Sequence, residues 1–404
     1  MHTLRLLLDT RCCEAELEKR FRAITHIHNV CVKHTRNLLV RLDHNREYQD
    51  LRKRYLEAGR ELAALQKQDP DKETVRKIRE LEQLRKDLSK SMNAIRCDLC
   101  LSKAGLEAWL KVCGKQFRHL VSSQQVQAEA DRVWAGAEKC LFGSGRILHY
   151  KKPDEILSIS GKSNMNGAIF HPETMTVTWT GLELPIRLPK KASDLQYISE
   201  SLNGTVAYCE IQKKAFPSGW RYYVNLCIRG DAPANGRTAG TGAMGIDPGT
   251  STMAAVGEKA AFLEELAPDI VRYNREILDL QYHLEGSRHT TNPGKYNPDG
   301  TINRKNRDRW VRSKAYRRNL QKLRCVYRKK AAYLKQDHEE RANRFLAEAG
   351  VIYTEQMEYH ALQKRSRQTV RKDTASEIRK KDGTIRTVHK FRRKKRFGRS
   401  LNNR

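Results

Sequence analysis

Two acidic residues stand where a carboxylate can do chemistry, each at the end of an apolar segment. The stretch Ala243–Gly257 predicts a short strand that runs into Asp247, a Pro248–Gly249 turn and a second strand. Residues 351–355 (VIYTE) predict another buried strand, which ends in Glu355. A carboxylate at the end of a buried strand is costly unless water, a positive partner or a cation stabilises it. An ordinary hairpin, in which Asp247 starts the turn, is an equally simple interpretation.

The segment between the two acids predicts how they are positioned. A basic helical run extends from Asp308 to Ala349, and Gly350 is a suitable C-terminal stop. A strand–helix–strand unit favours a crossover that places the second strand parallel to the first, and neighbouring strands lie ~4.8 Å apart. Asp247 and Glu355, 108 positions apart, are therefore expected to share divalent cations. Phosphodiester hydrolysis with two metals uses carboxylates that hold ions ~3.5–4 Å apart.

The composition indicates a polyanionic partner. The 404 residues allow two or three domains, and 78 Lys and Arg against 47 Asp and Glu give a net charge of +31. Nucleic acid is the natural counterpart. A membrane partner is disfavoured, because no apolar run approaches the ~18 residues of a spanning helix and no basic amphipathic segment has a wide apolar face. The ten scattered cysteines and the absence of a signal pattern suit a reducing cytoplasm.

The periodicity of the chain changes twice. Residues 3–9 predict one short strand, and helical spacing then dominates from Glu14 to Ser144, with a break at Asp69–Pro70. From Arg146 to Gly230 the period is two, which is typical of a small barrel or sandwich. The turn-rich residues 231–242 predict a linker. The five predicted strands are Arg146–Tyr150, Met175–Trp179, Leu184–Leu188, Thr205–Ile211 and Trp220–Ile228.

Two further motifs are weak as binding sites. Cys97 and Cys100, with Cys113 and His119 downstream, have the ligand types of a zinc site. Only one CxxC pair is present and the setting is helical, so zinc is not expected. Residues 161–163 (GKS) match the end of a phosphate-binding loop, but Ile156 stands where that loop needs glycine.

Basic residues supply the candidates for nucleic-acid contact. Arg221, Tyr222 and Tyr223 alternate along one predicted strand, so one side packs inward and the other is available to nucleic acid. Residues 361–404 carry 17 Lys and Arg against 3 Asp and Glu, a net charge of +14. We interpret them as a phosphate-contacting arm, with a solvated tail as the alternative. The candidate residues are Lys162, Arg221, Lys364, Arg365, Arg367, Arg392, Arg393, Lys394 and Lys395.

Taken together in order, several segments resemble the TnpB family, the transposon-associated relatives of compact type V CRISPR effectors. They are residues 160–164 (SGKSN), 220–224 (WRYYV), 245–252 (GIDPGTST), 297–302 (NPDGTI), 353–357 (YTEQM), 362–365 (LQKR) and 396–401 (RFGRSL). The resemblance implies an α+β multidomain protein. It implies a wedge β-barrel (1–13 and 145–230), a helical recognition domain (14–144), a linker (231–242), a partial RuvC-like α/β domain of RNase H fold (243–360) and a basic arm (361–404).

The resemblance also implies a function. Family members are RNA-guided DNA endonucleases that use Mg²⁺, a guide RNA from the transposon end and a double-stranded DNA target, so that base pairing supplies specificity. Asp247 matches the first catalytic acid and Glu355 the second. The family is often labelled transposase, but no pair of histidines with a nucleophilic tyrosine supports strand transfer. A prokaryotic, nucleoid-associated location follows from the resemblance.

The chain departs from the family after Glu355. The family has a third catalytic Asp and a zinc ribbon there, whereas this sequence has no paired CxxC knuckles and only the acids Glu358, Asp373, Glu377 and Asp382. The sequence therefore predicts a C-terminally truncated member with a weakened Mg²⁺ site and no zinc. Loss of a direct ligand should exceed the roughly 10–100-fold effect of changes in the surrounding shell. The alternative is a nuclease-deficient repressor that binds DNA under RNA guidance.

Overall fold

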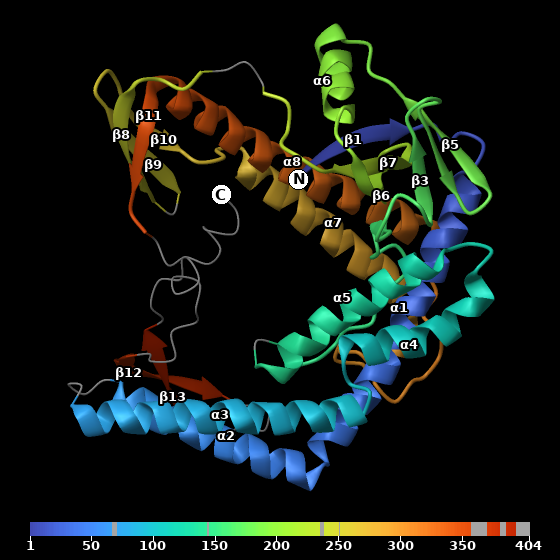
Figure 1. Ribbon diagram of the computed structural model, residues 1–404. Helices are drawn as coiled ribbons and strands as arrows, with labels where there is room; N and C mark the ends of the chain where they lie inside the picture. Colours follow the sequence, from blue (N-terminus) through green and yellow to red (C-terminus); the bar gives the residue numbers. More distant parts are fainter. Residues whose placement is uncertain are drawn as a thin grey trace. The chain divides into compact units, whose positions relative to one another are not determined.

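The computed structural model describes residues 1–66, 71–143, 145–234, 238–249, 251–356, 370–379 and 385–392. The chain forms two compact units, which can be followed by colour in Figure 1. The first contains Met1–Lys214 and Trp220–Pro233, and the second contains Ala215–Gly219 and Ala234–Arg404.

The first unit follows its opening strand, β1 (His2–Leu8), with a group of helices. The helical spacing predicted over residues 14–144 is confirmed here. The side chain of Asp71, rather than the predicted Asp69–Pro70 pair, caps α3 by accepting from the amide of Thr74; residues 67–70 lie outside the described ranges. The helices are α1 (Glu14–Asp43), α2 (Arg46–Leu65), α3 (Lys72–Asp98), α4 (Lys103–Gly114), the short 3₁₀ helix η1 (Lys115–Phe117) and α5 (Ser123–Leu141).

A seven-stranded sheet completes the first unit, in the order β2-β6-β7-β1-β5-β4-β3. Its outer strands β2 and β3 do not pair with each other within the described ranges, so this sheet is open and does not close into the predicted small barrel. Both strands are short, and Arg132 of α5 donates to the carbonyl of Ser158 in β2 at 2.9 Å. The remaining elements are β2 (Ser158–Ser160), β3 (Ala168–His171), β4 (Thr176–Trp179), β5 (Leu182–Arg187), α6 (Ala192–Leu202), β6 (Val206–Phe216) and β7 (Gly219–Ile228).

Four of the five strands predicted in this region are confirmed as β4, β5, β6 and β7, but the strand predicted at Arg146–Tyr150 is wrong. Leu148 is buried so close to Gly136 of α5 that a β-carbon there would lie 2.7 Å from its Cδ2 atom. The amide of Lys151 donates to the side chain of Asn29 at 2.7 Å. The segment therefore follows the surface of helices α1 and α5 instead of pairing with a strand.

The second unit contains a four-stranded sheet in the order β10-β9-β8-β11 (Figure 1). Strands β8, β9 and β10 form antiparallel hairpins, and β11 returns after the long helix α8 to pair parallel with β8. The predicted parallel crossover pairing is thus confirmed. The elements are β8 (Gly242–Pro248), β9 (Thr252–Gly257), β10 (Ala261–Glu265), α7 (Ile270–Thr291), η2 (Pro293–Lys295), α8 (Lys314–Glu348), β11 (Ala349–Thr354), and the hairpin β12 (Val370–Arg379) and β13 (Ile385–Arg392).

One face of this small sheet is covered by α8 and the other is exposed. Met244 and Ala255 pack with Phe345 at the end of α8, and α7 packs against α8 through a separate apolar cluster that includes Ile277 and Val326. On the opposite face, the side chains of Val256 and Leu263 are largely exposed. The sheet therefore presents one side of β8 and β11 to solvent.

Candidate functional site

Asp247 lies near the carboxyl end of β8, on the exposed face of the sheet. Side chains alternate along a strand, so Met244 and Ile246 point toward the apolar cluster whereas Gly245 and Asp247 point away from it. Asp247 pairs in register with Ala254 of β9, one pair before the strands meet the turn at Pro248 and Met253. The hairpin interpretation is therefore structurally correct, and it leaves the Asp247 carboxylate exposed.

Glu355 directly follows β11 and is also exposed. The last paired residues of the two parallel strands are Thr354 and Ile246, so the next residues along the chain, Glu355 and Asp247, lie side by side at the same end of the sheet. Both line one open pocket of about 420 Å³. The structure thus brings together the two carboxylates that the sequence singled out.

The floor of this pocket is formed by small residues. Gly245 lies between Tyr353 of β11 and Val256 of β9, and Ala254 lies opposite Asp247, so no Cβ atom at Gly245 fills the space beside Asp247. The two carboxylates therefore lie in an open pocket with small residues beside them.

Close backbone contacts hold the start of β11 against the segment that leads into β8. A β-carbon at Gly240 would lie 2.4 Å from the carbonyl carbon of Glu348, and one at Gly350 would lie 2.5 Å from the carbonyl oxygen of Gly240. Both glycines are therefore required by the approach of the two chain segments, which sets the register that aligns Asp247 with Glu355.

Gly240→Ala is expected to destabilise the second unit by about 1–3 kcal/mol, because the added methyl group meets backbone atoms that cannot rotate away. Chemical denaturation followed by circular dichroism measures this change. Gly286→Ala in α7 is the matched control: nothing lies within 4 Å of its new methyl group, so helix propensity should make it neutral or stabilising by up to about 1 kcal/mol. Equal stability of the two variants would contradict the close-contact explanation.

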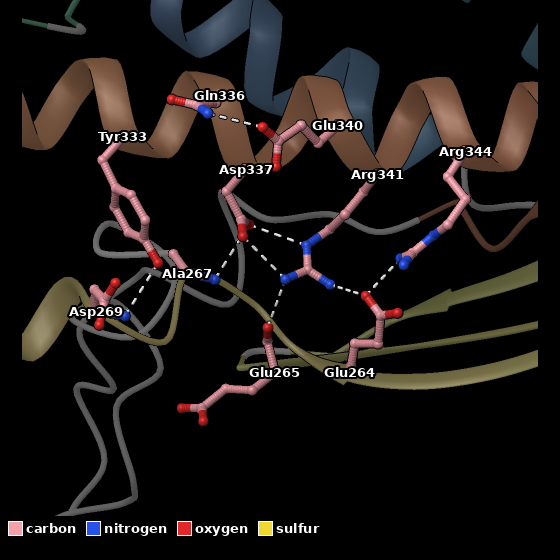
Figure 2. A network of polar contacts seen from close by, with 10 residues as sticks. All are labelled: Glu264, Glu265, Ala267, Asp269, Tyr333, Gln336, Asp337, Glu340, Arg341 and Arg344. Carbon is pink, nitrogen blue, oxygen red and sulfur yellow. Dashed lines mark hydrogen bonds and ion pairs between the residues drawn. The ribbon is translucent and has the colours of Figure 1, made fainter.

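A polar network joins α8 to the end of β10 (Figure 2). Arg341 donates to Asp337 at 2.9 and 3.0 Å, to the carbonyl of Glu265 at 2.8 Å and to the carboxylate of Glu264. Arg344 also donates to Glu264, at 2.6 Å. The charges of two arginines are thus matched by two carboxylates, and the network holds the helix that leads into β11.

The same network extends to the segment between β10 and α7. Asp337 accepts from the amide of Ala267 at 3.2 Å, and the hydroxyl of Tyr333 accepts from the amide of Asp269 at 3.0 Å (Figure 2). Burial by itself raises the pKa of Asp337, but the hydrogen bonds from Arg341 and Ala267 outweigh it and hold the pKa below its usual value of 3.8. The charged form of Asp337 therefore stabilises the fold.

Asp337→Asn is expected to lower the free energy of unfolding by about 1–3 kcal/mol at neutral pH and to reduce the loss of stability in acid. The contribution of Asp337 is fully present above its unfolded pKa and is lost as the pH falls through the lower folded value. Denaturation from pH 7 down to pH 2 measures both effects. Glu340→Gln, at an exposed position where the side chain accepts from Gln336 at 2.7 Å (Figure 2), should keep the wild-type acid dependence. A matching loss in both variants would contradict this role of Asp337.

Lys162 is engaged in ion pairs within the first unit. Its Nζ atom lies 2.8 Å from Glu107 and 3.0 Å from Asp131. Burial lowers the pKa of Lys162, but the hydrogen bonds that its ammonium group donates to Glu107 and Asp131 outweigh that effect and raise the pKa above its usual value. These contacts tie the loop after β2 to α4 and α5, and a phosphate at Lys162 would have to compete with two carboxylates.

Arg221 and Tyr223 lie on the exposed face of β7, whereas Tyr222 is fully buried. The hydroxyl of Tyr222 donates to Glu18 at 2.7 Å. The alternation predicted for this strand is therefore confirmed. Arg392 is the last residue of β13. The other predicted basic residues of the arm, Lys364, Arg365, Arg367, Arg393, Lys394 and Lys395, lie outside the described residues.

The donor set of the pocket fits a hydrated divalent ion. In the ranges that the structure describes, no three or more His, Cys, Asp or Glu side chains converge on one point. Among these described residues, neither the set Cys97, Cys100, Cys113 and His119 nor the carboxylate pair forms such a group of three. Mg²⁺ keeps several waters and is commonly bound through one or two carboxylates together with substrate phosphates. Asp247 and Glu355 supply that number of donors.

Comparisons with solved structures include two distant neighbours. No family model and no curated protein match the chain. A cryo-EM structure of a Cas12f1-sgRNA-target DNA complex is similar at a TM-score of 0.36 and 9% identity, over 88% of this chain and 81% of that one. A CRISPR-Cas12f ternary complex has a TM-score of 0.28 and 13% identity, over 89% and 81%. Among the described residues, no helix is long and apolar enough to span a bilayer.

Proposed function

We propose that this chain is an RNA-guided DNA-binding protein of the TnpB lineage, whose metal-dependent endonuclease centre contains Asp247 and Glu355. The observation that carries the proposal is the placement of both carboxylates at adjoining ends of parallel strands, facing one open pocket. Its partners are a guide RNA from the transposon end and a double-stranded DNA target. The ordered motifs that resemble the TnpB family and the net charge of +31 support it.

In this proposal Asp247 and Glu355 hold Mg²⁺ through their exposed carboxylates. The bound ion would supply an activated water and stabilise the leaving oxygen of a phosphodiester. Asp247 belongs to β8 and Glu355 directly follows β11, so the pairing of these two strands sets the spacing of the carboxylates. The small floor residues Gly245 and Ala254 admit the DNA backbone beside them.

The first half of α8 supplies a surface for the backbone of nucleic acid. Residues 314–330 contain eight Lys and Arg and no Asp or Glu. Among them, Arg317, Arg318, Lys322 and Lys329 are exposed. Such a stripe binds phosphates without reading sequence, as expected of a protein in which base pairing with RNA supplies specificity.

Cleavage and binding assays on one preparation test this proposal. The full chain is co-expressed with DNA of the transposon end, purified with its RNA and given a matched double-stranded target with Mg²⁺ or with EDTA. Mg²⁺-dependent cleavage by the wild type and its loss in Asp247→Asn would support the endonuclease. Binding of the target by both proteins without cleavage would favour the repressor alternative, and absence of RNA-dependent binding would overturn both.

A further inference from the structure

A second cavity, in the first unit, lies between its large sheet and helix α6. It has a volume of about 710 Å³, within the range of roughly 300–1,000 Å³ typical of small-ligand sites. Strands β7, β1 and β5, which are neighbours in the sheet, form its floor. The lining residues that matter for its chemistry are Arg5, Leu7, Arg187, Lys190, Tyr197 and Tyr223.

The floor combines aromatic, apolar and cationic side chains in one row. Leu7 of β1 pairs in register with Tyr223 of β7 on one side and with Arg187 of β5 on the other. Leu4 and Leu6 of β1 are buried in the core, so Arg5 and Leu7 face the cavity by alternation. Adjacent strands are ~4.8 Å apart, so the outer members of this row are separated by roughly the length of a nucleotide's base and sugar.

The cavity is positively charged. Arg5, Arg187 and Lys190 line it against the single carboxylate of Asp194. Arg187 is also near enough to Asp9 to help lower the pKa of that carboxyl group. Arg5 is held in place: its Nε atom donates to Asn225 at 2.9 Å, and Asn225 donates to Glu210 at 2.9 Å. Arg5 is thereby held on the floor of the cavity, and the exposed side chains of Arg187 and Lys190 supply positive charge for a phosphate group.

Two tyrosines provide faces on which a base can stack. Tyr197 of α6 is 38% exposed and lines the cavity. Tyr223 is half-buried on the floor, and the ammonium group of Lys214 lies 5.2 Å from its ring centroid. Stacking of bases on aromatic side chains next to basic residues is a general mode of binding single-stranded nucleic acid.

We propose that this cavity holds one unpaired nucleotide of a bound single-stranded nucleic acid, with the base against Tyr197 and the phosphate on Arg187 and Lys190. The site is separate from Asp247 and Glu355, and it requires neither metal binding nor DNA cleavage. RNA and DNA both supply a base that can stack and a phosphate group, so each is tested separately.

Site-mapped photo-crosslinking avoids the background from the other basic surfaces of a protein with a charge of +31. The full chain is irradiated with single-stranded RNA that contains 4-thiouridine, or with DNA that contains 4-thiothymidine, and crosslinked peptides are identified by mass spectrometry. We expect crosslinks at Tyr197 or Tyr223. Tyr197→Ala should reduce their yield about tenfold and weaken binding in the preferred arm by about tenfold, and Tyr197→Phe should retain both.

Matched variants separate the cavity from general electrostatics. The double variant Arg187→Ala, Lys190→Ala should weaken binding about tenfold more than Lys151→Ala, Lys152→Ala, which removes two exposed charges elsewhere in the same unit. Tyr282→Ala, at a site 79% exposed in the second unit, controls for the loss of a surface tyrosine. Crosslinks confined to other peptides, an unchanged yield in Tyr197→Ala, or equal effects of the two charge variants would each overturn the proposal.

Discussion

Asp247→Asn and Glu355→Gln are each expected to reduce Mg²⁺-dependent DNA cleavage by more than about 100-fold. This figure is a minimum. Changes to groups that only support metal ligands already reduce metal affinity or activity roughly 10–100-fold, and here the ligand itself is changed. Both substitutions keep the size of the side chain and replace a charged donor with a neutral amide. Because both residues are exposed, the fold should be unaffected, which thermal denaturation can verify.

The double variant tests whether the two carboxylates act as one site. Groups that work as a unit give strongly non-additive losses of activity. The double variant Asp247→Asn, Glu355→Gln should therefore have nearly the same cleavage rate as the less active of the two single variants. Glu258→Gln is the control, since Glu258 is an exposed acid at the other end of the same sheet, beside Gly242. Cleavage rates measured at saturating Mg²⁺ distinguish additive from non-additive losses of activity. Additive losses, or an equal loss in Glu258→Gln, would contradict a shared site.

Removing the exposed charges of α8 is expected to weaken nucleic-acid binding by on the order of 100- to 1,000-fold near 0.1 M salt. The change is Arg317, Arg318, Lys322 and Lys329 to Gln in one protein. If all four contact phosphates, the slope of log K against log salt should fall in magnitude by about 3.6, or 0.9 for each contact. Fluorescence anisotropy with a labelled DNA duplex at several salt concentrations measures both quantities.

Helix α3 offers a control with the same loss of charge. Lys72, Arg76, Lys77 and Arg79 are exposed, but Arg76 pairs with Glu80 at 2.9 Å and Lys77 with Glu73 at 3.3 Å. Their charges are partly balanced on the helix itself, as in a solvated face. Changing these four to Gln should alter the affinity by less than about tenfold. A similar loss in both quadruple variants would mean that net charge alone, and not the α8 surface, drives binding.

The carboxylate pair could be located from sequence because its signals are local. Each acid follows an apolar strand, and the helix between them is long and free of prolines from Lys314 to Glu348. Parallel pairing then follows from the length of the crossover. What could not be predicted is the precise alignment of the strands, since this depends on contacts such as those of Gly240 with Glu348, which no periodicity reveals.

Other features depend on partners far away in the chain. Lys162 was predicted to contact nucleic acid, and nothing near it in sequence indicated that Glu107 and Asp131, 55 and 31 positions earlier, lie within 3.0 Å of its ammonium group. Helix α6 was missed although Leu195, Ile198 and Leu202 have helical spacing, because its eleven residues lie between segments that were read as strands. The cavity between α6 and the seven-stranded sheet was therefore not predicted from any sequence motif.

Binding of Mn²⁺ to the full chain, followed by the loss of the EPR signal of the free ion, shows directly whether Asp247 and Glu355 form one metal site. Mn²⁺ has the same preference for carboxylate oxygens as Mg²⁺, and the measurement requires neither guide RNA nor target. We predict a Mn²⁺ site in the wild type and in Glu258→Gln that is lost or weakened at least about tenfold in both Asp247→Asn and Glu355→Gln. Wild-type Mn²⁺ affinity in either of these two variants would contradict the claim that Asp247 and Glu355 hold one ion together.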